Sequence, residues 1–128
     1  MLATGITHTI SFTVTDTLSA RSMGSGSLDV LATPAMIAGM ENVCMNCVQP
    51  HLEGGFTTVG TKVDISHIAA TPVGDIVTFT CVLTEVDRKR LVFSVEAFDS
   101  AGKIGEGTHQ RFIVDSVKFT EKAYSKKK

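Results

Sequence analysis

Glu41 is the strongest candidate for a reactive side chain, because it is the only formally charged residue between Asp29 and Glu53. The residues around it are mostly apolar or small, so we expect its carboxylate to sit in an apolar environment. An unpaired carboxylate there is costly, so it must be partnered, protonated or functional. A functional carboxylate of this kind acts as a general base or as a nucleophile. The structural alternative is a Glu41 that leans toward solvent or bonds a backbone group.

His67 is the second candidate, and it ends a run of alternating residues that begins at Phe56. The alternation predicts a strand with one face made of Val59, Thr61, Val63, Ile65 and His67, and the other of Gly60, Lys62, Asp64 and Ser66. A lone histidine on an apolar face is usually a satisfied core residue. Here the core that it faces also contains Glu41, which makes an acid–imidazole pair the competing interpretation.

A helix must carry Glu41. Thr33 is suited to the N-cap and Pro34 to the first helical position, and Pro50 marks the end. The residues between are apolar or small on nearly every side, which predicts a buried helix. It would be only about 22 Å long at roughly 1.5 Å per residue, too short to span a bilayer.

The rest of the chain reads as strands. The expected strands are 7–15, 56–67, 76–86, 91–98 and 103–115. One helix after the first strand and a meander of strands after it predict an α+β fold, an antiparallel five-stranded sheet wrapped around one central helix. Residues 1–128 would form one domain, with 117–128 as a polar C-terminal extension. The polar segment 16–27 contains a flexible loop, Gly24–Ser27, that is either a lid over a site or a plain connector.

Composition excludes several classes of function. With 128 residues and a net charge of −1, the chain offers no electrostatic case for nucleic acid or a membrane surface. The first basic residue is Arg21 and no apolar signal segment follows the start, which favours a cytoplasmic protein. Three cysteines argue against a disulfide framework. Cys44 and Cys47 are best interpreted as buried core thiols, and no His/Cys/Asp cluster predicts a metal site.

The last predicted strand holds two glycines and an arginine of interest. Gly105 and Gly107 predict a bulge or a close backbone approach, for example by a ligand. Arg111 lies among apolar residues, where it could hold an anionic ligand or pair with an acid of a partner chain. The alternative is a surface arginine on the polar face of the strand.

Three motifs in register resemble one known family. They are A-T-P-x-M-I-A-G-M-E in the helix, S-H-I-A-A-T-P-V-G-D after the second strand, and G-x-G-T-H-Q-R in the last strand. Together they resemble the fluoroacetyl-CoA thioesterase branch of the hotdog-fold acyl-CoA thioesterases, over about Thr7 to Val117. The resemblance implies a hotdog fold and hydrolysis of a small or short-chain acyl-CoA thioester to free acid and CoA.

The same resemblance implies roles for individual residues. Thr33, Glu41 and His67 would form the catalytic group, and Gly60 and Arg111 would contact the thioester. His67 would orient Glu41 or the attacking water. Coenzyme A would enter as part of the substrate, with no cofactor, and a homodimer or dimer of dimers would place each site at a subunit interface.

The chain departs from that branch at one place. The specialised enzyme has an aromatic lid ahead of the helix, whereas this chain has Ser27 and Leu28 there, which favours a general thioesterase. Two other functions compete with it. A non-catalytic acyl-CoA-binding hotdog module would use the same groove, and a hotdog dehydratase or hydratase would need a different His/acid placement, for which no motif is seen.

Overall fold

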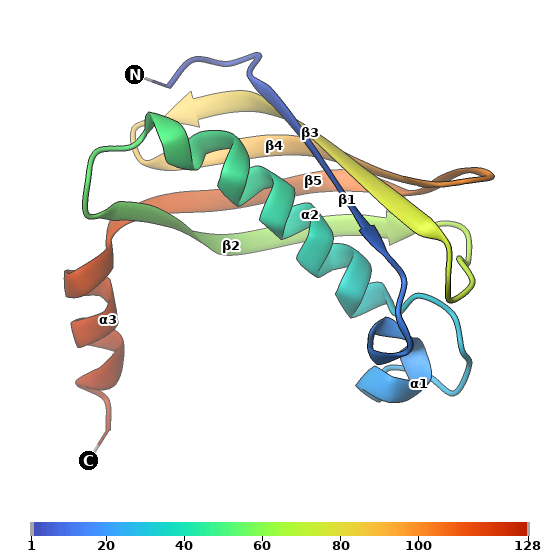
Figure 1. Cartoon of the computed structure of the whole chain (residues 1–128). Helices are drawn as coiled ribbons and strands as arrows, with labels where there is room; N and C mark the ends of the chain where they lie inside the picture. The colour runs from blue at the N-terminus through green and yellow to red at the C-terminus, as the bar shows by residue number, and fades with distance from the viewer. Residues whose placement is uncertain (1, 128) are drawn as a thin grey trace.

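The structure, a computed structural model, describes residues 2–127. Five strands form one antiparallel sheet in the order β1-β3-β4-β5-β2. The strands are β1 (Thr7–Thr13), β2 (Phe56–His67), β3 (Ile76–Asp87), β4 (Arg90–Asp99) and β5 (Gly102–Asp115). A single long helix, α2 (Thr33–Val48), lies along one face of the sheet (Figure 1). This confirms the predicted α+β arrangement of five strands around one central helix.

Helix α2 packs tightly on the sheet. A Cβ on Gly39 would lie only 2.4 Å from the Cζ atom of Phe79 on β3, so a larger residue would push the helix away from the sheet. Met36, Met40 and Val43 line the buried side of the helix and are at most 1% exposed. Burial of these side chains against the aromatic residues of the sheet provides the hydrophobic driving force that fixes α2 in place.

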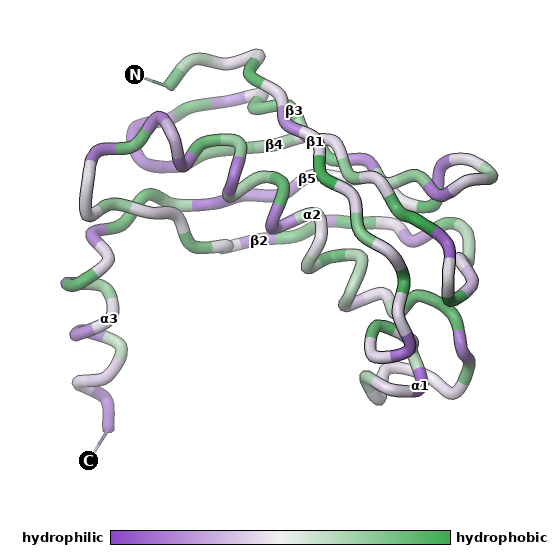
Figure 2. Tube along the Cα trace, viewed as in Figure 1, coloured by the Kyte–Doolittle hydropathy of each residue, from purple (hydrophilic) through white to green (hydrophobic). Residues whose placement is uncertain are grey.

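The helix differs from the prediction in two respects. It is buried on one side only, because Pro34, Ala38 and Asn42 are exposed, and the trace in Figure 2 shows hydrophilic residues among hydrophobic ones along α2. In addition, Thr33 is not the N-cap. Ala32 occupies that position without a side-chain bond, and Thr33 is the first helical residue, with its hydroxyl engaged elsewhere.

A bulge in β2 corrects the predicted alternation. The pairing of β2 with β5 shifts between Gly60, which faces Arg111, and Lys62, which faces Gln110. One extra residue reverses which side chains point toward the helix. Gly60 therefore lies on the same side of the sheet as His67, whereas strict alternation had placed them on opposite faces.

Two segments for which no helix was predicted contain helix. The segment before α2 holds a 3₁₀ turn η1 (Asp16–Leu18) and a short helix α1 (Ala20–Met23), which ends at Gly24 with a φ of 74°. The predicted C-terminal extension, 117–128, lies mostly in helix α3 (Ser116–Tyr124), which points away from the sheet (Figure 1). Residue 128, at the end of this extension, lies outside the described residues. Within residues 2–127 no helix combines the length and hydrophobicity needed to cross a membrane.

Candidate active site

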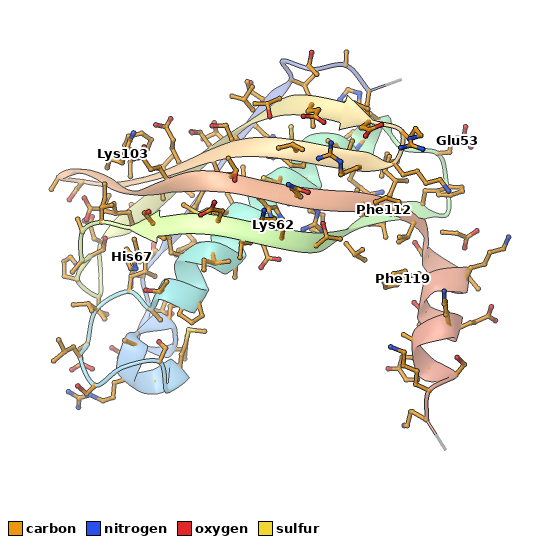
Figure 3. The ribbon with its side chains drawn as sticks, turned by 180° about the vertical axis from the view of Figure 1, so that it is seen from behind. Glu53, Lys62, His67, Lys103, Phe112 and Phe119 are labelled. Carbon is orange, nitrogen blue, oxygen red and sulfur yellow. The ribbon has the colours of Figure 1, made fainter. Side chains whose placement is uncertain are left out.

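Thr33 and His67 form a direct contact at one end of the helix. The Thr33 Oγ1 atom lies 2.7 Å from the His67 Nδ1 atom, within hydrogen-bonding distance. Thr33 comes from the first turn of α2 and His67 from the last residue of β2, where Figure 3 shows it beside the helix start. The unpaired backbone N–H groups of a helix start favour negative charge nearby, so this is a suitable place to stabilise an oxyanion.

His67 has one ring nitrogen free for chemistry. Its Nε2 atom is buried and has no hydrogen-bond partner among residues 2–127. Burial lowers the pKa of His67 below its ordinary value, because the charged imidazolium would lose hydration. The imidazole is therefore neutral at pH 7, and a neutral imidazole can donate one proton or accept one.

A cleft of about 290 Å³ adjoins the Thr33–His67 pair. Mostly small side chains line it: Ala20, Ser25, Val30, Leu31, Thr33, His67, Ile68, Ala69 and Ala70. Ser25 belongs to the loop Gly24–Ser27, so the structure places that loop at the edge of the cleft. The cleft leaves space beside these two polar side chains.

Glu41 lies two turns further along α2, about 12 Å from Thr33 at 1.5 Å per residue. It faces the bulged part of β2. Its Oε2 atom is 2.9 Å from the point where a Cβ on Gly60 would sit. Gly60 therefore makes room for the Glu41 carboxylate, a role that the sequence analysis assigned to the substrate.

The expected contact between Glu41 and His67 is absent within the described chain. Among residues 2–127, no hydrogen bond or ion pair joins the two side chains, and His67 pairs with Thr33 instead. The reason is their position along the helix: His67 reaches the first turn, whereas Glu41 sits in the middle. Direct orientation of Glu41 by His67 is therefore not found within a single chain, and orientation of the attacking water by His67 stays a prediction.

Arg111 is buried and held by hydrogen bonds, so the alternative prediction of a surface arginine on the polar face of the strand is wrong. It is 6% exposed. Its Nε atom donates to the Thr58 hydroxyl at 2.7 Å and its Nη2 atom donates to the Thr58 carbonyl at 2.8 Å. Burial lowers the pKa of Arg111, and the nearby Glu41 carboxylate opposes that shift. The Nη1 atom lies 3.4 Å from the same Gly60 point that Glu41 approaches.

His109 is the site residue that sequence reasoning missed. It is 1% exposed, and its Nδ1 atom lies 2.8 Å from the Lys62 carbonyl oxygen at the bulge. Its Nε2 atom lies 3.2 Å from the Arg111 Nη1 atom. Burial, and to a lesser extent the Arg111 charge, lower the pKa of His109. Its spacing of two residues from Arg111 in a strand was the available signal, because such residues share a face.

The remaining sequence predictions concern packing. Gly105 and Gly107 do allow close approach, but to protein atoms: a Cβ on Gly105 would lie 2.6 Å from the Met36 Sδ atom, and one on Gly107 would lie 2.1 Å from the Asp64 carbonyl oxygen. The cysteines are free and buried, as predicted. Across residues 2–127, no three His, Cys, Asp or Glu side chains converge as a metal site would require.

Comparison with known proteins finds similarity to one family of thioesterases. Residues 14–117 match the model of the fluoroacetyl-CoA-specific thioesterase family. The fluoroacetyl-CoA thioesterase of Streptantibioticus cattleyicolor is 40% identical over 98 residues, which are 77% of this chain and 70% of that protein.

Solved structures extend the similarity to the whole fold. A structure of the fluoroacetyl-CoA thioesterase FlK superposes with a TM-score of 0.94 at 33% identity, covering 100% of this chain and 99% of that one. An FlK variant in complex with acetyl-CoA also gives 0.94 at 33% identity, with 99% and 100% covered. A thioesterase superfamily member of Thermus thermophilus shares the fold, with a TM-score of 0.89 at 24% identity over 98% and 93% of the two chains. The chain therefore has the hotdog fold and belongs to the fluoroacetyl-CoA-specific thioesterase family, whose members are thioester hydrolases.

Proposed function

We propose that this protein hydrolyses small or short-chain acyl-CoA thioesters to the free acid and CoA, using Thr33, Glu41 and His67. The observation that carries the proposal is the Thr33–His67 contact of 2.7 Å beside a cleft of about 290 Å³. Family membership supports the reaction class, and the FlK complex with acetyl-CoA supports the kind of ligand. CoA is part of the substrate, and no cofactor takes part.

Thr33 and His67 handle the thioester in this proposal. The Thr33 hydroxyl and the N–H groups of the helix start orient the acyl group and stabilise the developing oxyanion. In this proposal the Nε2 atom of His67, which is buried and has no hydrogen-bond partner among residues 2–127, passes a proton to the leaving CoA thiolate. A neutral imidazole suits this role because it can take a proton from water before donating it.

Glu41 supplies the attack on the carbonyl carbon by one of two routes. As a general base, it takes a proton from water, and the resulting hydroxide displaces the CoA thiolate. As a nucleophile, its oxygen bonds to the carbonyl carbon, the thiolate leaves, and water then hydrolyses the mixed anhydride. When water attacks the Glu41 carbonyl carbon of the anhydride, single turnover in ¹⁸O-labelled water puts the label into Glu41 and leaves the first product unlabelled. The general-base route puts the label into the product acid.

A homodimer is part of the proposal. β2 is an edge strand of the sheet, and an edge strand presents unpaired backbone groups that a second copy can pair with. Val63 on this strand is 44% exposed and Ile68 just beyond it is 55% exposed, so the edge also offers apolar surface. Pairing along β2 places Gly60 and His67 at the interface, where each site draws residues from both chains.

The test is release of free CoA, followed with a thiol reagent, from fluoroacetyl-, acetyl-, butyryl- and hexanoyl-CoA. We expect turnover with the short chains. A folded protein that binds these thioesters in calorimetry but releases no CoA would instead be the non-catalytic acyl-CoA-binding module. The same panel identifies the preferred acyl length. Because Ser27 and Leu28 stand where an aromatic lid would be, we expect the protein to accept a wider range of acyl groups than fluoroacetyl alone.

A further inference from the structure

We propose that His109 is a positioning residue, a neutral imidazole that holds the Arg111 guanidinium close to Glu41 but prevents it from pairing with the carboxylate. The inference rests on the proposed function of Glu41. It begins with the space left by Gly60. The point where a Gly60 Cβ would sit is 3.2 Å from the His109 Cε1 atom, and the Glu41 carboxylate and Arg111 reach the same point.

The proton on His109 is fixed by its partners. A carbonyl oxygen can only accept a hydrogen bond, so the Nδ1 atom, 2.8 Å from the Lys62 carbonyl, carries the hydrogen. The Nε2 atom of the neutral ring then has a free lone pair and accepts from the Arg111 Nη1 atom at 3.2 Å. The bulge in β2 is what turns the Lys62 carbonyl toward His109.

This arrangement gives each nitrogen of Arg111 an acceptor and occupies three of its five N–H donors. Thr58 accepts from two of its nitrogens and His109 from the third. Within residues 2–127, no nitrogen of Arg111 comes within 4.0 Å of a Glu41 oxygen, although both side chains approach the Gly60 point. The Glu41 carboxylate oxygens are therefore not held in an ion pair with Arg111 and are free to take a proton or attack a carbonyl carbon.

Few titratable groups lie near Glu41 among residues 2–127. His109 and Arg111 face it from β5, β2 contributes the uncharged Gly60, and Cys44 lies nearby on its own helix. A hydrogen-bond contact with Cys81 and burial raise the pKa of the Cys44 thiol, so it stays protonated. A change in the pH dependence of Glu41 on alteration of His109 therefore reports a movement of Arg111.

Two substitutions separate the two bonds of His109. In His109→Gln the amide oxygen can replace the Nε2 acceptor toward Arg111, whereas in His109→Asn the amide can replace only the Nδ1 donor toward the Lys62 carbonyl. We expect H109Q to keep kcat within about threefold of the parent. We expect H109N to lower kcat about 10- to 100-fold with KM little changed, because Arg111 then pairs directly with Glu41.

The pH readout is specific to positioning. A direct ion pair with Arg111 lowers the pKa of a carboxylate, so in H109N the acid limb of kcat/KM and the ¹³C titration midpoint of the Glu41 carboxyl both shift to lower pH. Retained kcat in H109N with loss in H109Q would show that His109 only anchors the bulge and would overturn the proposal. An unshifted Glu41 midpoint in folded H109N would overturn it as well.

The outcome is independent of whether hydrolysis occurs. If the parent protein releases no CoA, the proposed function fails, while the Glu41 titration and the ring ¹⁵N shifts of His109 still decide the positioning role. We expect ¹⁵N shifts of a neutral ring protonated at Nδ1, and a ring protonated at Nε2 would contradict the proposal. Thermal unfolding of each variant confirms that the comparison is made on folded protein.

Discussion

The Thr33 hydroxyl meets the His67 imidazole at 2.7 Å, although the residues are 34 positions apart in the chain. This contact joins the first turn of α2 to the end of β2, while the helix begins after Ala32 without a side-chain cap. The Thr33 hydroxyl thus holds the imidazole and does not cap the helix. Residues in sites commonly break a local rule in this way because the tertiary contact serves chemistry.

Removal of the Thr33 hydroxyl tests the contact. We expect Thr33→Ala to lower kcat/KM about 10- to 100-fold, since His67 loses its partner and the acyl group loses a donor. Thr33→Ser keeps the hydroxyl and should stay within about fivefold of the parent. Equal activity of the Ala and Ser variants would contradict a role for the hydroxyl.

Loss of the charge on Glu41 tests the attacking group. Glu41→Gln keeps the shape of the side chain but removes the base and the nucleophile, so turnover should fall by about 10³-fold or more while the fold persists. Glu53→Gln is the matched control, because Glu53 is exposed at the far end of the helix. Near-normal thioester hydrolysis by folded E41Q would remove Glu41 from the mechanism.

A methyl group at Gly60 tests whether the Glu41 carboxylate needs the space that glycine leaves there. Its Cβ would sit 2.9 Å from the Glu41 Oε2 atom, so Gly60→Ala should displace the carboxylate and reduce kcat about tenfold or more. Gly54→Ala is the control, since no atom lies within 4 Å of a Cβ there. A crystal structure of G60A with Glu41 unmoved would argue against this account.

The buried histidines predict how stability varies with pH. Burial lowers the pKa values of both His67 and His109, so near pH 6 the unfolded chain binds more protons than the folded one. The free energy of unfolding then rises with pH through this window. The contribution of the two histidines is fully present above their ordinary pKa of about 6.5 and is lost as the pH falls below that value. Urea unfolding between pH 5 and 8 measures this slope. H109Q should show a shallower slope than the parent, and an unchanged slope would count against the contribution of His109.

The exposed edge strand β2 leads us to expect a homodimer that pairs along this strand. Val63→Lys places a charge on the exposed edge strand, and we expect it to convert a dimer to a monomer in sedimentation and to reduce activity. Val117→Lys, on exposed α3, is the control and should leave the dimer intact. A parent protein that sediments as a monomer at micromolar concentration and is fully active would refute the dimer.

Much of the fold was predictable because its signals are local. Hydrophobic periodicity and turn residues indicate each strand within one or two residues of its observed bounds, and Pro34 and Pro50 bracket the helix. The isolation of Glu41 in an uncharged segment marked it as a candidate site residue. Packing of α2 on one sheet then follows, since the helix has only the sheet to cover its apolar side.

The arrangement of the site depended on tertiary structure. One extra residue after Gly60 reverses the alternation of β2; a glycine inside a strand is a signal for a bulge, but it does not fix where the register shifts. Arg111 meets Thr58 across 53 positions of sequence, and His109 becomes part of the site only through that pairing. The sequence by itself determined which elements form and which acid stands alone, because those depend on neighbours in the chain. Which side chains touch was decided by strand register and helix placement, because contacts between distant residues exist only after the sheet closes on the helix.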